Sequence, residues 1–162
     1  MGGVKANGLF DGGNKFPTIF YNLQLVLSRA FFPFLSRRID KHYLFCKINL
    51  GTAIIGATIL IILSPWIVKI ILGDEFESSI IVMQILSASI VFLALSNTYG
   101  TNYLIIKHKE RQLRNLTFVS SFVGMISAIP LVYYFSYIGA ALTILLSRAL
   151  LGVLSYIVAR KY

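Results

Sequence analysis

Long apolar runs separated by short polar clusters dominate the 162-residue chain. A helix that crosses the ~30 Å hydrocarbon layer of a bilayer needs ~20 mostly apolar residues. The runs do not alternate apolar and polar positions as membrane β-strands do. We therefore predict an all-α integral membrane protein with about five transmembrane helices, over residues 16–36, 48–72, 78–100, 113–135 and 137–159. The glycine-rich residues 1–15 are predicted to form a loop or a frayed helix start ahead of a helical bundle formed by residues 16–162.

The first of these segments, residues 16–36, is the least typical membrane span. It is apolar enough to insert but holds several polar residues and a proline: Asn22, Gln24, Ser28, Arg29 and Pro33. Two arrangements stay open. The segment can lie in the membrane interface, which leaves four spans with both termini inside. Alternatively, it crosses the membrane with the N-terminus outside, as in the C-terminal piece of a longer protein.

Composition narrows the class of protein. Apolar residues make up 57% of the chain and charged residues only 13%, whereas soluble domains are about one quarter charged. This excludes an ordinary soluble globule, because too little polar surface is available to cover it. The abundance of Ile, Leu and Phe excludes a disordered chain, and the single Cys46 excludes a disulfide scaffold.

The net charge of +9, from 15 Lys and Arg against 6 Asp and Glu, would suggest a nucleic-acid partner in a soluble protein. Sorted by position, however, ten basic residues fall on one side of the membrane if every segment spans. They are Arg37, Arg38, Lys41, Lys47, Lys107, Lys109, Arg111, Arg114, Arg160 and Lys161. The positive-inside rule places that side, and the C-terminus, in the cytoplasm. The basic charge is therefore a topology signal, and we expect no nucleic-acid partner.

Two arginines, Arg29 and Arg148, remain inside the predicted spans. Inserting a charged side chain at the centre of a membrane helix costs ~2.5–3.5 kcal/mol on insertion scales, so each arginine requires a structural or functional explanation. Lys15, Asn22, Arg29 and Ser36 are spaced by seven residues and form one polar stripe if the helix is continuous, with Gln24 and Ser28 nearby. Such a stripe suits a wet cavity in which a guanidinium binds phosphate through two parallel hydrogen bonds. The alternative is that Arg29 snorkels to the interface or caps a neighbouring helix.

Two other places hold polar groups that could contact a ligand. Arg148 can bind cargo near the middle of the last span, or it can serve as a buried partner for carbonyls or for another helix. Residues 96–103 are the most polar uncharged stretch, and Asn97 and Tyr99 within it can offer an amide and a hydroxyl to sugars. The alternative for this stretch is tyrosine anchoring at the membrane interface.

The chain shows no set of residues typical of an enzyme. No Gly-rich nucleotide loop with Lys and Ser/Thr is present. His42 and His108 are isolated in basic loops, and the acidic group Asp74, Glu75 and Glu77 reads as a solvated turn. We expect no catalytic residue, no metal site and no cofactor.

Several short motifs carry a family resemblance. Leu72, Gly73 and Phe76 form a Leu-Gly-x-x-Phe motif at the end of a span, and residues 107–114 form a basic loop. Pro33 and Ser36 form a Pro-x-x-Ser motif, and a Gly-Ala-Ala sequence opens the last helix at residues 139–141. These motifs, spread over most of the chain, resemble the C-terminal half of bacterial polysaccharide-repeat flippases. These O-antigen transporters belong to the multidrug/oligosaccharidyl-lipid/polysaccharide exporter superfamily.

The resemblance implies a fold of two six-helix lobes, of which the five spans match the second lobe without its first helix. It implies a partial flippase, not active alone, in the bacterial inner (cytoplasmic) membrane. The implied partners are the lipid bilayer, a missing N-terminal lobe and a polyprenyl-diphosphate-linked oligosaccharide moved by alternating access. The candidate cavity residues are Arg29, Asn22, Gln24, Arg148, Asn97 and Tyr99.

Three alternatives stay open at this point. A multidrug-type exporter fragment of the same fold would be expected to carry an acidic residue inside the membrane, and none falls within the predicted spans. A small non-transporting protein with four spans would need no cargo site. A truncated reading frame would leave the same sequence without activity.

Overall fold

The apolar runs fold as helices, and every regular element within the described residues 3–161 of this computed structural model is helical. This confirms the predicted all-helical class. The four α-helices are α1 (Val4–Arg37), α2 (His42–Ile67), α3 (Ser79–Leu95) and α4 (Glu110–Ala159). Two π-helical segments, η2 (Val68–Leu72) and η4 (Ser96–Leu104), continue α2 and α3. Short 3-10 turns, η1 (Ile39–Lys41) and η3 (Asp74–Phe76), lie in the connections.

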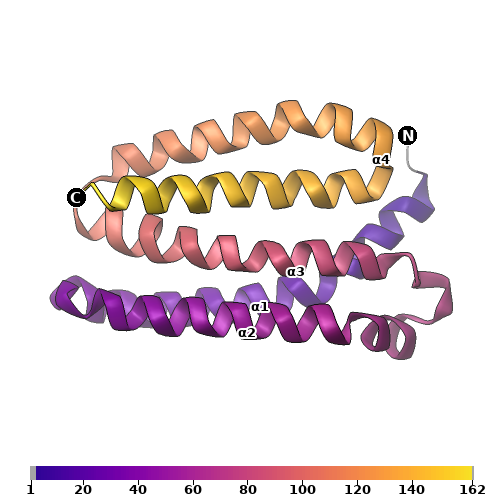
Figure 1. The fold of residues 1–162 in the computed structure, drawn as a ribbon, viewed down its shortest axis with the longest axis horizontal. Coiled ribbons are helices and arrows are strands. Elements are labelled where there is room, and N and C mark those ends of the chain that lie inside the picture. Colours follow the sequence, from indigo (N-terminus) through magenta and orange to yellow (C-terminus); the bar gives the residue numbers. More distant parts are fainter. Residues whose placement is uncertain (1–2, 162) are drawn as a thin grey trace.

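The helix α4 folds back on itself at Ser136, which has a positive φ of 49° inside an otherwise helical run. Its two arms, residues 110–135 and 137–159, lie side by side as the orange and yellow ribbons of Figure 1. Gly139 packs directly against the backbone of Leu131 in the other arm, where no side chain fits. The sharp turn falls between the two segments that the sequence predicts here.

A loop and a frayed helix start are the two forms predicted for residues 1–15, and over residues 4–15 the structure does not show the loop. Residues 4–15 are helical, because α1 begins at Val4. The glycines that suggested a loop serve close packing instead. A Cβ atom on Gly13 would lie 2.7 Å from the carbonyl oxygen of Ser79, and one on Gly12 would lie 3.1 Å from the Phe76 ring. The glycines thus let the start of α1 approach the start of α3.

Three helical stretches in the described chain are long and apolar enough to cross a membrane: His42–Leu72, Ser79–Leu104 and Glu110–Ala159. The last has 50 residues, or about 75 Å at 1.5 Å per residue, which is more than twice the hydrocarbon thickness. Each of its arms therefore has the length of one span. The helix α1 is not among these three stretches, because polar residues interrupt its apolar positions. That α1 crosses the membrane therefore stays a prediction.

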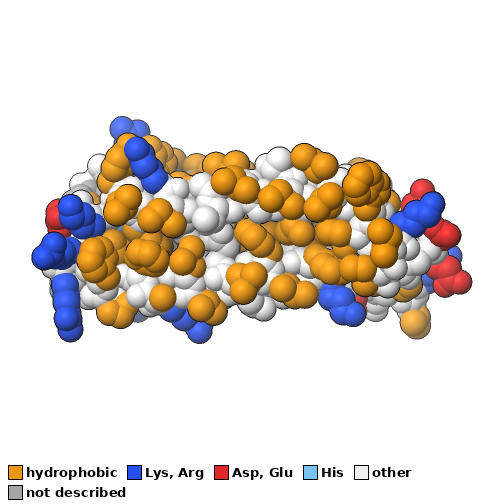
Figure 2. Space-filling model, turned by 90° about the horizontal axis from the view of Figure 1, so that it is seen from below, with side chains coloured by type: hydrophobic (Ala, Val, Ile, Leu, Met, Phe, Trp, Pro, Cys, Tyr) orange, Lys and Arg blue, Asp and Glu red, His pale blue; other side chains and the backbone are white. Residues whose placement is uncertain are grey.

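The helix α3 is the centre of the bundle and packs against α1, α2 and α4 (Figure 1). Its side chains Val82, Leu86 and Ile90 are almost completely buried. The outward faces of the other helices carry large exposed apolar side chains, which suits contact with lipid. Figure 2 shows the same arrangement as an apolar band with most Lys and Arg side chains at one end and most acidic side chains at the other, where some basic side chains also lie.

Candidate functional site

The most unusual polar contact in the bundle centres on Arg148, halfway along the second arm of α4. Its Nη1 donates a hydrogen bond of 2.7 Å to the Ser89 hydroxyl of α3. Its guanidinium carbon lies 5.8 Å from the centre of the Tyr21 ring of α1. Arg148 precedes the end of α4 at Ala159 by about 16 Å of helix rise. Three helices thus meet around one half-buried cation midway along the second arm of α4.

This cation has no ion-pair partner in the described part of the chain. One ion pair is found there, between Lys69 and Asp74 (3.9 Å), and it lies at an exposed turn. The Ser89 hydroxyl and the Tyr21 ring offer Arg148 a dipole and a π-face but no negative charge. A charged side chain inside a membrane bundle is a functional-site hypothesis by default. This geometry would allow the Arg148 guanidinium to bind an anion and to donate hydrogen bonds to it.

The polar stripe expected on α1 lies on its exposed face. Lys15, Asn22, Arg29 and Ser36 are all exposed, and in the continuous helix α1 their spacing places them on one face. Tyr21, whose ring lies near the Arg148 guanidinium, immediately precedes Asn22 of the stripe. Arg29 lies about 12 Å of helix rise beyond Tyr21, toward the end of α1. Within residues 3–161, the side chains of Asn22 and Arg29 make no hydrogen bond or ion pair.

Gln24, another predicted cavity residue, lies on the opposite, inward face of α1. Only 4% of its surface is exposed, and its Nε2 donates a 3.0 Å hydrogen bond to the Thr52 hydroxyl of α2. Its neighbour Ser28 is also buried and accepts a 2.7 Å hydrogen bond from Nδ2 of Asn102. The structure therefore corrects the expected placement of Gln24 and Ser28 beside the stripe. Both side chains join α1 to the helices packed against it.

The polar run at residues 96–103 lies in the π-helix η4, which the sequence did not predict. In a π-helix the backbone bonds run from i to i+5, so the ordinary carbonyl pairing is disturbed. Side chains of α2 contact the carbonyls there. Asn49 Nδ2 donates to the Ala94 carbonyl (3.3 Å) and to the Thr98 hydroxyl (2.9 Å), and His42 Nε2 lies 3.1 Å from the Thr98 carbonyl.

The two ligand candidates of this run, Asn97 and Tyr99, have different surroundings. The Tyr99 hydroxyl lies 3.1 Å from the Cys46 sulfur, and its ring packs edge-on against Tyr156 with 5.0 Å between centroids. Asn97 is half-buried. Tyr99 thus contributes to packing between α2, η4 and α4. The sequence feature that coincides with the π-helix is the polar run at residues 96–103.

The Asn49 contacts give a first test of this packing. We expect Asn49→Ala to lower the thermal unfolding midpoint of the detergent-solubilised protein, because it removes both donated bonds from fully buried acceptors. The expected loss is about 1–3 kcal/mol of unfolding free energy. The matched control is Asn22→Ala, which removes the same amide from an exposed helix position. Equal midpoints for the two variants would contradict a structural role for Asn49.

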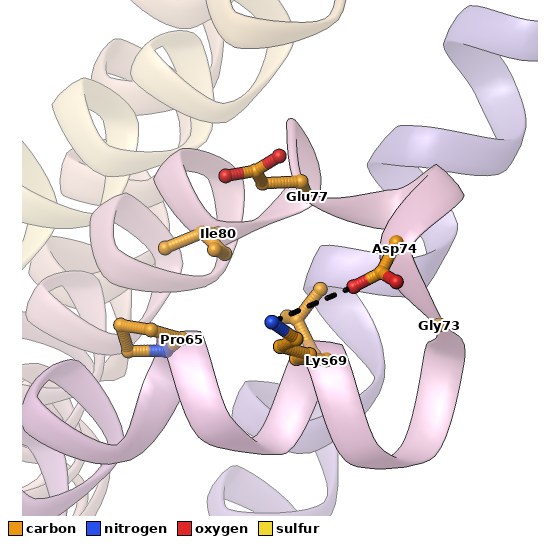
Figure 3. Close-up of a pocket in the computed structure, with 7 residues that line it drawn as sticks. Pro65, Lys69, Gly73, Asp74, Glu77 and Ile80 are labelled. Atoms are coloured by element: carbon orange, nitrogen blue, oxygen red, sulfur yellow. Dashed lines mark ion pairs between the residues drawn. The ribbon is translucent and has the colours of Figure 1, made fainter.

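A second place that could bind a ligand is the turn between α2 and α3. A cavity of about 190 Å³ lies there, lined by Pro65, Val68, Lys69, Gly73, Asp74, Glu77 and Ile80. Lys69 and Asp74 point toward one another across the turn (Figure 3). Both side chains are more than two-thirds exposed, so water screens their charges. In the described part of the chain, no group of three or more His, Cys, Asp or Glu side chains is placed to hold a metal ion.

The apolar helices define the class: this is a multi-pass helical membrane protein. Two curated relatives match nearly the whole chain. A protein of Escherichia coli (strain K12) named "Putative O-antigen transporter" is 24% identical over 169 aligned residues, which cover 99% of this chain and 41% of that protein. A protein of the same name from Shigella dysenteriae is 26% identical over 148 residues, which cover 88% of this chain and 37% of that protein.

These relatives confirm the resemblance to O-antigen transporters that the sequence motifs indicate. The chain spans about two fifths of the length of the relatives it matches. Their names describe transporters and not enzymes, in agreement with the expected class. No protein-family model matches the chain, and no solved structure matches it significantly.

Proposed function

We propose that this chain forms part of the translocation pathway of a polysaccharide-repeat flippase in the bacterial inner membrane. The flippase would move a polyprenyl-diphosphate-linked oligosaccharide outward by alternating access between two lobes. The similarity to proteins named as O-antigen transporters supports the transporter class. The observation that carries the proposal is Arg148, a mid-depth cation that is bonded to Ser89 and has no carboxylate partner among the described residues.

The chemistry of the cargo fits this cation. A diphosphate is anionic, and a guanidinium can donate two parallel hydrogen bonds to its oxygens. Arg29 would hold the diphosphate nearer the basic end of the bundle and Arg148 at mid-depth. Asn22, exposed on the stripe between them, would donate to or accept from sugar hydroxyls. The α1 stripe and the Arg148 cluster would thus line one polar path.

The membrane potential supplies a direction for this movement. With the basic end in the cytoplasm, an inside-negative potential favours outward transfer of an anion by ~2.3 kcal/mol per charge per 100 mV. A doubly charged diphosphate would gain ~4–5 kcal/mol if no cation travels with it. The arginines would compensate its charge on the way through the low-dielectric layer.

The proposed topology has α1 crossing the membrane, and reporter fusions test it. We expect a reporter inserted after residue 5 to lie outside the cytoplasm and one inserted at residue 108 to lie inside. The reason is that the ten basic residues on the predicted inner side hold that end in the cytoplasm. Alkaline phosphatase and green fluorescent protein fusions read the two locations. A cytoplasmic residue 5 would contradict the five-span arrangement and favour four spans.

Arg29 provides the test of the cargo stripe. We expect Arg29→Ala, introduced into the chromosomal gene, to lower the amount of surface polysaccharide, because the diphosphate loses its contact nearer the cytoplasm. The matched control is Arg37→Ala, which removes an exposed arginine at the end of the same helix. Polysaccharide is measured on gels together with the protein level. Unchanged polysaccharide in Arg29→Ala, at normal protein level, would remove Arg29 from the pathway.

A further inference from the structure

The basic end of the bundle holds a small cavity that the transport path does not use. It has a volume of about 250 Å³ and lies between the start of the first arm of α4 and the end of the second. Its walls are Gln112, Asn115, Leu116, Val158 and Lys161. This end carries most of the Lys and Arg side chains in Figure 2, and most acidic side chains lie at the other end.

The groups around this cavity suit a phosphate. Lys161 lines it and is exposed, and Asn115 brings an exposed amide donor. Arg111 lies one helical turn before Asn115 on the same face, and it is exposed too. Arg160, next to Lys161, lies with its guanidinium carbon 5.6 Å from the centre of the Tyr156 ring. One cation, Lys161, therefore lines the cavity, and Arg111 and Arg160 are chain neighbours of residues that line it.

The surface leading away from the cavity along α4 is apolar. Val119, Phe122 and Ile126 follow Asn115 at spacings of four, seven and eleven residues, which places them on the same face of the helix. Each of them is more than half exposed. A polar cavity at the helix end thus continues directly into an apolar strip that points toward the membrane interior.

We propose that this cavity binds the headgroup of an anionic phospholipid. The phosphate diester contacts Arg111, Asn115 and Lys161, and the acyl chains lie along Val119, Phe122 and Ile126. A soluble phosphate compound would use the cations but would leave the apolar strip uncovered, so the continuity of the two surfaces favours a membrane lipid. The site is separate from the Arg148 cluster and does not depend on the transported cargo.

Native mass spectrometry of the full chain, released from nanodiscs that contain equal phosphatidylcholine and phosphatidylglycerol, tests this proposal. The unmodified protein is expected to retain phosphatidylglycerol in preference to phosphatidylcholine. A basic residue near an anionic lipid surface contributes about 1 kcal/mol, or about fivefold in affinity. The double variant Arg111→Gln/Lys161→Gln should therefore lose about 25-fold of this preference.

The matched control is Arg37→Gln/Arg38→Gln, which removes two exposed charges from the same end of the bundle but away from the cavity. Because these two residues do not line the cavity, it should keep more of the preference than Arg111→Gln/Lys161→Gln does. An equal loss in both double variants would overturn the proposal, because it would show attraction to the basic end as a whole. No preference in the unmodified protein would overturn it as well. Circular dichroism in phosphatidylcholine nanodiscs verifies that each variant is folded.

Discussion

Replacing Arg148 by alanine is expected to reduce export of surface polysaccharide by about 10- to 160-fold. A hydrogen bond to a charged group contributes about 1.5–3 kcal/mol, and each 1.36 kcal/mol changes a rate tenfold. Loss of the guanidinium would leave the anionic cargo without a counter-charge at mid-depth. The measurement is the amount of surface polysaccharide in cells that carry Arg148→Ala in the chromosomal gene, normalised to the level of the protein.

Two further variants distinguish the effect of the positive charge at position 148 from the effect of its hydrogen bonds. Arg148→Lys keeps the charge but loses the planar fork, so an intermediate reduction is expected. Ser89→Ala removes the 2.7 Å hydrogen bond and keeps the cation, so a smaller reduction is expected than in Arg148→Ala. Normal polysaccharide in Arg148→Ala, at normal protein level, would show that Arg148 has no part in transport.

The second large effect concerns the packing of α4 against α3. Gly152→Ala is expected to destabilise the protein by about 1–3 kcal/mol and to lower its thermal unfolding midpoint by several degrees. The added Cβ atom would lie 2.5 Å from the carbonyl oxygen of Phe92. This neighbour is backbone, so it cannot rotate away as a side chain would, and the two helices must separate.

The matched control for this variant is Gly51→Ala in α2. A Cβ atom there meets nothing within 4 Å, and alanine is favoured over glycine inside a helix by roughly 1 kcal/mol. The control should therefore keep or raise the unfolding midpoint in detergent. A midpoint for Gly152→Ala as high as that of Gly51→Ala would contradict the close contact between α3 and α4.

The helices that are apolar along most of their length could be predicted from the sequence. Their sequence signal is local, because a run of about 20 apolar residues identifies a candidate span without information on the helices packed against it. The turn at Ser136 between the two arms of α4 was predictable for the same reason. The helical start of α1 was not, because Gly12 and Gly13 are explained by Phe76 and Ser79, which lie more than 60 positions away.

The candidate site was predictable in part. The spacing of seven residues grouped Asn22 with Arg29 on one face of a helix, and both are exposed. Gln24 is as polar as Asn22, so residue type alone did not show that it faces inward to Thr52. The contacts of Arg148 with Ser89 and Tyr21 join three helices and could not be read from one segment. The π-helix η4 was not predicted, and its contacts with Asn49 and His42 of α2 likewise join segments far apart in the sequence.

Photo-crosslinking in living cells tests most directly whether the α1 stripe and Arg148 line a path for a lipid-linked oligosaccharide. A photo-reactive amino acid in place of Asn22 lies on the exposed stripe, and one in place of Ile129 lies on the exposed apolar face of α4. After irradiation, protein with the probe at position 22 is expected to carry the oligosaccharide, detected by antibody to the sugar, and protein with the probe at position 129 is not. Equal labelling at both positions, or no labelling at position 22, would contradict the proposed path.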